Sequence, residues 1–156
     1  MHFKKILLLL CGILPFVVMA SELNIYYQDQ HWKLTRDALL AIKPSSMTTQ
    51  SPWDDSPSEF QGVYLKDLLE HLDIGANNLT AKALNDYEEK FRVSDAVSKK
   101  AFIAVLRDGK PMPIRNKGPY WIIFPWQELE TDSEVNTNRT FNTWSVWQLS
   151  SISLTD

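Results

Sequence analysis

Apolar and polar positions along the chain follow strand-like or helix-like periods, and each period predicts a short element. Two-residue alternation over residues 23–27 predicts a first strand. Helical spacing then predicts a helix that Thr35 caps and Pro44 ends. The apolar members of this helix are Leu34, Ala38, Leu39 and Ile42. A second strand is predicted over residues 46–50, and the Ser-, Pro- and Asp-rich residues 51–59 predict a loop.

The middle of the chain continues with a helix, a strand and a second short helix. A stripe of leucines predicts a helix with Gly75 at the C′ position that follows its end. The stripe consists of Leu65, Leu68, Leu69 and Leu72. Alternation over residues 79–84 predicts a strand, and Ser94 is the candidate cap of a helix over residues 95–99.

The last third of the chain is mostly strand-like. A continuous apolar run over residues 101–106 predicts a buried strand, and Asp108-Gly109 predicts a tight turn after it. Aromatic and β-branched residues over 120–124 predict another strand. Residues 131–140 have the composition of an exposed loop, and alternation over 141–152 predicts a final strand. Short strands, mostly joined by hairpins, with two or three short helices predict an α+β domain with mixed sheets.

The N-terminus has the pattern of a secretory signal. Lys4 and Lys5 precede an apolar run over residues 6–18, and small residues follow at the expected cleavage position. We therefore predict a signal peptide over residues 1–20, export to the periplasm, and one domain over residues 21–156. An uncleaved anchor is the alternative, although the run is shorter than the roughly 20 residues that span a bilayer.

Charge and residue chemistry then argue against several classes of function. Loss of Lys4 and Lys5 with the signal changes the formal charge from −3 to −5, which argues against a nucleic acid or an anionic membrane as partner. The only cysteine, Cys11, also leaves with the signal, so the mature chain has no thiolate. His31 and His71 lack metal-ligand spacing, so no metal site is predicted.

The six tryptophans are more than a small core usually needs, so some are expected at a surface or pocket. Trp53 lies in a polar loop after a strand and is a candidate stacking lid. Trp121 and Trp147 lie in apolar strands, so we expect them in the core. Trp126 follows Pro125 and is a candidate exposed contact with a partner.

Several segments, taken in order and spacing, are similar to one family. They are residues 51–53, 60–65, 67–69, 83–87, 94–95, 104, 108–110, 115–119 and 146–149. Together they resemble the oxidoreductase molybdopterin-binding domain, the central domain of the sulfite oxidase family, and most of all its short, exported, single-domain relatives. The resemblance extends over about residues 42–152, and it implies the α+β fold of that domain.

One residue that the family's enzymes need is missing. Their molybdenum is bound by a cysteine thiolate, a soft ligand that no hydroxyl or amide replaces. The corresponding stretch here, residues 47–51, has no cysteine. The resemblance also implies that molybdenum cofactor is inserted in the cytoplasm, and an unfolded exported chain would leave it behind. We therefore expect no molybdenum and no catalytic residue, but a pocket that still binds a pterin.

A pterin has a flat face and an edge with N–H donors beside a carbonyl acceptor, so it needs aromatic walls and amide or carboxylate groups. The residues expected to bind it are Trp53, Asn85, Asp86, Tyr87, Asp95, Arg115, Lys117 and Gly118. Tyr87 matches an active-site tyrosine of the enzymes; the alternative is a half-buried tyrosine bonded to the backbone. Asn85 and Asp86 adjoin it, or else shape a turn.

The other four candidates also have structural alternatives. Asp95 is equally suited to the first turn of a helix. The loop with Arg115 and Lys117 corresponds to one that approaches the cofactor in the enzymes, whereas charged hairpins are usually just solvated. Arg115 is the preferred ligand of the two, because a guanidinium bonds bidentately. Gly118 permits close backbone approach, or serves a simple turn.

The resemblance thus implies a non-catalytic periplasmic pterin-binding protein. It further implies a partner, the extracytoplasmic domain of a membrane sensor such as a histidine kinase or a cyclic-dinucleotide enzyme. Two alternatives stay open. One is a molybdenum-cofactor oxidoreductase subunit with a replaced metal ligand, and the other is a pure interaction module without a ligand.

Overall fold

The computed structural model describes residues 21–129 and 137–156. The predicted signal peptide over residues 1–20 lies outside the described residues, as does most of the predicted loop over 131–140.

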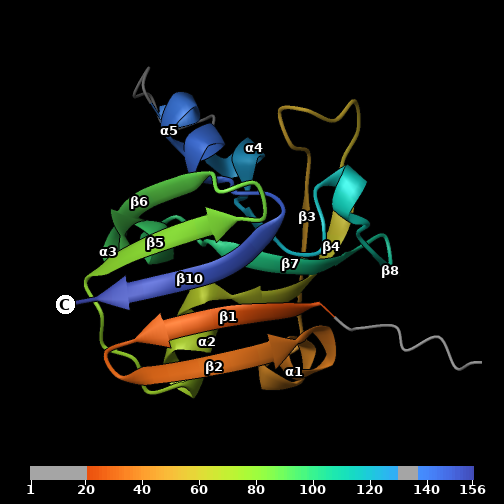
Figure 1. Ribbon diagram of the computed structural model, residues 1–156. Coiled ribbons are helices and arrows are strands. Elements are labelled where there is room, and N and C mark those ends of the chain that lie inside the picture. The colour runs from red at the N-terminus through yellow and green to blue at the C-terminus, as the bar shows by residue number, and fades with distance from the viewer. Residues whose placement is uncertain (1–20, 130–136) are drawn as a thin grey trace, which may run out of the picture.

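The described chain forms ten strands in two sheets (Figure 1). The strands are β1 Glu22–Tyr27, β2 Gln30–Thr35, β3 Ser45–Thr49, β4 Ser58–Tyr64, β5 Asn78–Ala83, β6 Glu88–Arg92, β7 Phe102–Arg107, β8 Lys110–Pro111, β9 Trp121–Ile123 and β10 Leu149–Thr155. The first sheet has the order β2-β1-β10-β5-β6, and in it β1 and β10 run parallel. The second sheet has the order β3-β4-β7-β8, with β9 also paired to β7.

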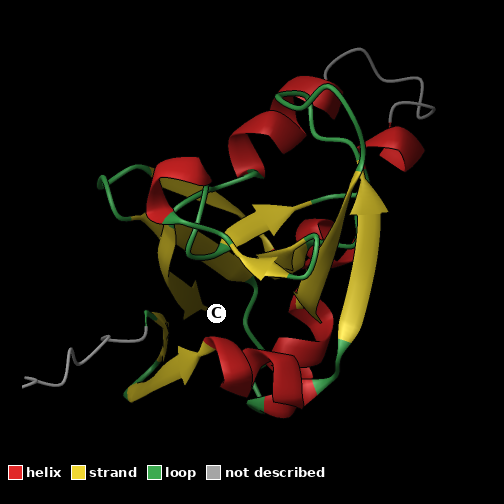
Figure 2. Cartoon of the chain, turned by 90° about the vertical axis from the view of Figure 1, so that its right-hand side faces the viewer, coloured by secondary structure: helices red, strands yellow, loops and turns green. Residues whose placement is uncertain are grey.

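Helices cover opposite ends of the two sheets (Figures 1 and 2). They are α1 Arg36–Ile42, α2 Leu65–His71, α3 Val93–Ser98, α4 Trp126–Leu129, α5 Thr137–Trp144 and the 3-10 helix η1 Ile114–Asn116. In Figure 1, α1 and α2 lie at the lower end, level with β1 and β2, and α4 and α5 lie at the upper end. In residues 21–129 and 137–156, no helix is long and apolar enough to cross a membrane. The α+β class and the mixed sheet are confirmed, with five α-helices among the described residues where two or three were expected.

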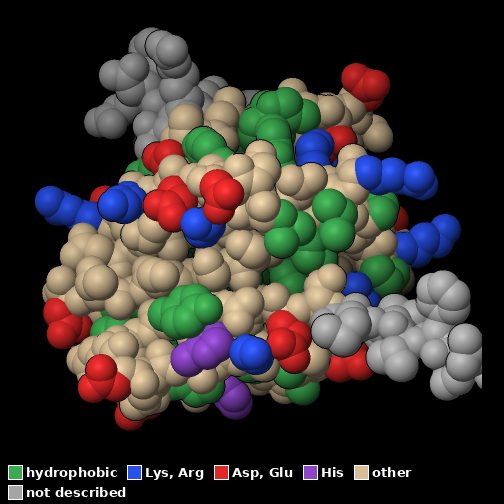
Figure 3. All heavy atoms as spheres, viewed as in Figure 1, with side chains coloured by type: hydrophobic (Ala, Val, Ile, Leu, Met, Phe, Trp, Pro, Cys, Tyr) green, Lys and Arg blue, Asp and Glu red, His purple; other side chains and the backbone are tan. Residues whose placement is uncertain are grey.

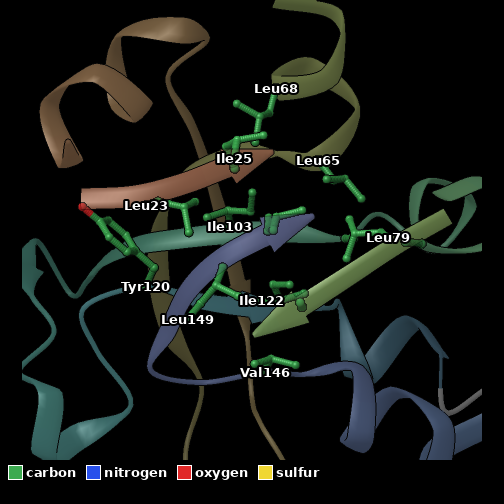
Figure 4. Close-up of a cluster of buried hydrophobic side chains, with 14 of the residues drawn as sticks. Leu23, Ile25, Leu65, Leu68, Leu79, Ile103, Tyr120, Ile122, Val146 and Leu149 are labelled. Atoms are coloured by element: carbon green, nitrogen blue, oxygen red, sulfur yellow. The ribbon is translucent and has the colours of Figure 1, made fainter. Parts of the chain in front are cut away.

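The main core lies between the two sheets (Figure 4). Leu23 and Ile25 of β1, Leu149 of β10, and Ile103 and Ile122 of the second sheet all belong to this core, and all five are almost fully buried. Figure 4 shows Ile25 beside Leu68 of α2, which closes one end of the core. Burial of side chains of this size stabilises the fold by about 1.5–3 kcal/mol each. This core holds the two sheets face to face.

The second sheet is also buried on its other face. A separate cluster there consists of Met47, Phe60, Phe102, Ala104, Met112, Trp121, Ile123 and Trp126. Because β7 contributes to both clusters, its sequence is continuously apolar rather than alternating. This confirms the prediction of a buried strand over residues 101–106.

Four strands, β2, β4, β6 and β8, were not predicted, and β2 and β6 show the reason. Leu34 belongs to β2, opposite Leu23, and not to the helix, which begins at Arg36 after the confirmed Thr35 cap. The hydroxyl of Thr35 accepts a hydrogen bond of 3.2 Å from the amide of Ala38. β6 pairs with β5, where Phe91 lies opposite Leu79. Both segments form strands because they pair with a neighbouring strand, and the sequence of one segment does not show which partner it pairs with.

Three other details of the sequence prediction were wrong. Asp73, with φ at 54°, takes the left-handed position after α2 that was assigned to Gly75. Ser94 lies inside α3, which starts directly after β6 without a side-chain cap. The alternation from Phe141 onward is helical as far as Trp144. Both aromatic side chains pack on Phe124, with ring centroids 5.2 and 6.3 Å away.

Candidate functional site

The turn between β5 and β6 presents two of the predicted residues to a cavity. The Oδ1 atom of Asn85 accepts a 3.2 Å hydrogen bond from the Tyr87 amide, so the asparagine both shapes the turn and borders the cavity. Asp86, with φ at 65°, points elsewhere: its carboxylate is exposed and pairs with Lys82 at 3.0 Å. Asn85 and Tyr87 therefore belong to the cavity wall, and Asp86 belongs to the turn.

The cavity has a volume of about 350 Å³ and lies between this turn and α5. It is lined by Ala83, Asn85, Tyr87, Asn142, Thr143, Ser145, Val146 and Trp147. The Tyr87 hydroxyl lies 3.2 Å from Glu89 Oε2 and 3.3 Å from the Thr143 carbonyl, so it connects the hairpin to α5. Burial, and then the charge of Glu89, raise the pKa of Tyr87, which keeps this hydroxyl protonated as a donor.

Residues 146–149 hold three parts of the site together through backbone hydrogen bonds. The Val146 carbonyl accepts from Ile122 of β9 at 3.0 Å. Gln148 donates its amide to the Lys117 carbonyl and accepts from the Leu84 amide, both at 2.9 Å. The Gln148 side chain also donates to the Ile114 carbonyl at 2.8 Å. The loop after η1 and the turn after β5 are therefore fixed side by side.

Trp53 packs in a cluster of four tryptophans. Its ring centroid lies 5.1 Å from Trp147 and 6.2 Å from both Trp121 and Trp126. The expectations for two of these residues were wrong. Trp147 is partly exposed and lines the cavity, whereas Trp126 is buried in the second core cluster. Trp53 contacts Trp147 but does not itself line the cavity, so it supports a wall rather than forming one.

Behind Trp53 lies a partly buried group of charges. The Asp54 carboxylate accepts a hydrogen bond from the Ser51 hydroxyl and lies 3.1 Å from Arg107 and 3.5 Å from the Lys117 ammonium. Burial favours a higher pKa for Asp54, but the Ser51 hydroxyl and the two cations hold this pKa below its ordinary value. Lys117 also lies over the rings of Trp121 and Trp53, at 4.7 and 5.6 Å.

Burial lowers the pKa of the Lys117 ammonium, and the charge of Asp54 offsets only part of this effect. The Lys117 ammonium therefore interacts with Asp54 and with the two tryptophan rings. It positions Trp53 and does not line the cavity.

The other three predicted residues lie outside the cavity wall. Arg115 is exposed in η1, and its guanidinium has no hydrogen bond or ion pair to any other described residue. Gly118 is buried where a Cβ atom would lie 1.9 Å from the Met112 carbonyl oxygen, so backbone packing accounts for this glycine. Asp95 follows β6 at Arg92, the end of the β5–β6 hairpin opposite to the turn that contains Tyr87.

Sequence reasoning missed Asn142, which lies in the last turn of α5. Asn142 is one of the residues that line the cavity, and its Oδ1 atom is buried without a hydrogen-bond partner among the residues the structure describes. An unsatisfied buried acceptor costs about 1–3 kcal/mol. The stretch around Asn142 has the composition of a loop and an alternating strand, so no signal in the sequence indicated an amide at this place.

Comparison with known proteins identifies the family. The family model described as the oxidoreductase molybdopterin binding domain matches residues 31–130, and the chain belongs to this family. The fold is similar to that in the crystal structure of the sulfane dehydrogenase SoxCD from Paracoccus pantotrophus, with a TM-score of 0.62 and 15% sequence identity. The alignment covers 87% of this chain but only 38% of that chain. A comparison with curated proteins gave no match.

The charge group predicts a pH-dependent stability. Because the folded-state pKa of Asp54 is lowered, its ionised form stabilises the fold above the unfolded-chain pKa, near 3.8, and this contribution is lost as the pH falls through the folded-state pKa. Asp54→Asn should therefore lower the free energy of unfolding at pH 7 by about 1.5–3 kcal/mol. The difference from wild type should shrink below pH 3.8. Urea unfolding of both proteins at pH 7, 5 and 3 measures the loss of stability and its dependence on pH.

Asp55→Asn is the matched control, because Asp55 is exposed next to Asp54 and its substitution removes the same charge. It should leave the unfolding free energy within about 0.5 kcal/mol of wild type. Equal effects of the two substitutions would contradict a specific role for Asp54.

Proposed function

We propose that this protein binds a pterin ring in the cavity between Tyr87 and Trp147, without molybdenum and without catalysis. The proposal rests on the cavity. Two aromatic residues and two asparagines line an open volume of about 350 Å³ in a domain of the molybdopterin-binding family. That volume lies within the range of about 300–1,000 Å³ that is typical of small-molecule sites.

The wall chemistry supports a flat ligand. Tyr87 and Trp147 offer ring surface for stacking, and Ala83 and Val146 add apolar contact. Asn85 uses its oxygen in the turn, so its amide nitrogen is available as a donor to a ring carbonyl. An open cavity also disfavours the alternative in which the pocket of a pure interaction module is filled by side chains.

The residues of the 47–51 stretch support binding without a metal. The Thr49 hydroxyl donates to Gln127 at 2.7 Å and accepts from the Trp126 amide at 3.2 Å. The Ser51 hydroxyl donates to Asp54, and Met47 is buried in the second core cluster. The buried hydroxyls of Thr49 and Ser51 are thus occupied, and the described residues contain no group of three His, Cys, Asp or Glu side chains that could hold a metal ion. This donor set does not fit a thiolate-bound metal.

The signal-like N-terminus supports export to the periplasm, where a pterin-binding protein could report on its ligand to a membrane protein. The surface near the cavity supports such a partner. Five of the six large hydrophobic side chains that are exposed in the described chain lie near the cavity, and we call them the apolar rim. They are Trp53, Leu84, Tyr87, Ile114 and Trp147.

The segments that carry the rim residues are joined by contacts already described. Trp147 contacts Trp53 and shares the cavity with Tyr87, and Gln148 bonds to the backbone of both Leu84 and Ile114. In Figure 3, hydrophobic side chains gather on the upper right part of the face shown. Exposed apolar groups collected in this way are typical of a protein interface. We infer that the partner is the extracytoplasmic domain of a membrane sensor, a histidine kinase or a cyclic-dinucleotide enzyme.

Pterin should raise the melting temperature of the mature protein, by roughly 5–10 °C at about a hundred times its Kd. Trp147→Ala and Tyr87→Ala should each weaken binding at least about tenfold, because each removes a stacking wall. Thermal shifts, measured against each variant's own unliganded melting temperature, and calorimetry check this. Tyr26→Ala, an exposed tyrosine outside the rim, is the control and should bind as wild type does. Absence of any shift with oxidised and reduced pterins would refute the proposed ligand.

Protein purified from the periplasm should contain far less than one molybdenum atom per chain, which elemental analysis measures. Mass spectrometry of the same preparation should detect a pterin without a metal. Stoichiometric molybdenum would favour the alternative of an oxidoreductase subunit with a replaced metal ligand.

Charged substitutions in the rim should abolish partner binding without emptying the cavity. Leu84→Glu and Ile114→Glu place carboxylates on the rim, yet neither residue lines the cavity, so pterin binding should persist. The measurement is crosslinking to membrane proteins, with identification of a sensor by mass spectrometry. Tyr26→Glu should crosslink as wild type does. Loss of the sensor from all three variants, or from none, would exclude the rim as the docking surface.

A further inference from the structure

One end of the apolar rim is acidic. There, residues 82–89 carry three carboxylates and a single cation, Lys82. Lys82 lies 3.0 Å from Asp86 and 3.5 Å from Glu88, so it neutralises only part of the negative charge. The Asp86 side chain is 85% exposed in the turn, two residues after Leu84 of the rim. We call residues 82–89 the acidic end.

The other end of the rim is basic. Arg115 follows Ile114 of the rim, is exposed, and has no ion pair within the described chain. Behind it, Asp54 faces two cations at once. The charged residues of this basic end are four cations and three carboxylates: Arg107, Lys110, Arg115, Lys117, Asp54, Asp55 and Asp108. The basic end therefore has an excess of one positive charge, whereas the acidic end has an excess of negative charge.

Gln148 joins the two ends. Its carbonyl accepts from the Leu84 amide of the acidic end, whereas its side chain donates to the Ile114 carbonyl of the basic end. Trp147 precedes it, and this ring both contacts Trp53 and shares the cavity with Tyr87. Rotation by a half-turn about an axis through this part of the rim brings the acidic end of one copy opposite the basic end of another. The rim is therefore complementary to itself in charge as well as apolar.

We propose that a second copy of this chain docks on the apolar rim, with Arg115 of each copy facing Asp86 of the other. The five rim side chains are 36–53% exposed, which leaves on the order of 400–500 Å² of apolar side-chain surface per copy. A standard interface buries about 800 Å² per partner, so we expect a weak two-fold dimer with a Kd of roughly 10–100 μM.

This inference uses the apolar rim but depends neither on pterin binding nor on the sensor. The dimer would cover Tyr87 and Trp147, which the rim shares with the cavity. A sensor domain that docks on the same rim would therefore have to displace the second copy.

Sedimentation velocity of the mature protein at about 5–500 μM tests the dimer. Wild type should show a monomer–dimer equilibrium that is stronger at low salt. Arg115→Glu and Asp86→Lys should each weaken association at least about tenfold, because each places like charges opposite one another. The double variant Arg115→Glu/Asp86→Lys exchanges the two charges, and it should associate to within about threefold of wild type.

Glu88→Lys is the second variant for the acidic end, because Asp86 has φ at 65° and its replacement also strains the turn. It should likewise weaken association, and Arg115→Glu should restore it. Tyr26→Glu, outside the rim, should associate as wild type does. The melting temperature of each variant checks that it is folded.

Three results would each overturn the inference: a wild type that stays monomeric throughout this range, an Arg115→Glu variant that associates as wild type does, or double variants no better than their parents. All three would leave pterin binding standing, because thermal shifts and calorimetry measure it separately. Absence of a pterin shift, in turn, would leave the dimer standing.

Discussion

The site depends on the backbone of residues 146–149, where the chain passes from α5 to β10. Val146 bonds to β9 of the second sheet, and Leu149, through its amide, bonds to the Tyr120 carbonyl at 2.9 Å. Between them, Gln148 with φ at 53° bonds to both the loop after η1 and the turn after β5. These backbone hydrogen bonds fix the chain where it crosses between the sheets, and they thereby fix the backbone position of Trp147. Its ring is therefore placed by main-chain bonds rather than by side-chain packing alone.

The two-sided burial of β7 provides the support behind that wall. One face of the second sheet completes the core between the sheets, and the other carries Trp121, on which Trp53 rests. Asp54 faces two cations there, Arg107 and Lys117, and the Lys117 ammonium lies over both tryptophan rings. Removal of one partner from such a group is destabilising, because it leaves the other charges partly buried without a counter-charge. These charges therefore hold residues 51–54 against the tryptophan cluster, and no bound ligand is needed for this.

Elements that local sequence determines were predictable. The Asp108-Gly109 pair has positive φ at both positions, as a two-residue hairpin turn requires, and β5 follows its alternation. The position of Asn85 and Tyr87 beside a cavity agrees with the sequence, because polar residues at a strand end are exposed by the turn itself. Their role in ligand binding stays a prediction. Asn142 and the exposure of Trp147 were not predictable. The helix that carries Asn142 depends on aromatic contacts with Phe124 and with Phe91, whose ring lies 5.0 Å from that of Trp144. Those contacts join segments far apart in the sequence.

The cavity and the apolar rim share Tyr87 and Trp147, so under the proposed function the two binding events cannot be independent. A ligand stacked on Trp147 removes part of its surface from water and restricts its ring. Any partner that contacts the same ring therefore meets a different surface in the two states. Linkage then requires that the partner change pterin affinity by the same factor by which pterin changes partner affinity. Because the Gln148 bonds hold the backbone on both sides of Trp147, this coupling needs no large conformational change. A change in the exposure and freedom of one ring is sufficient.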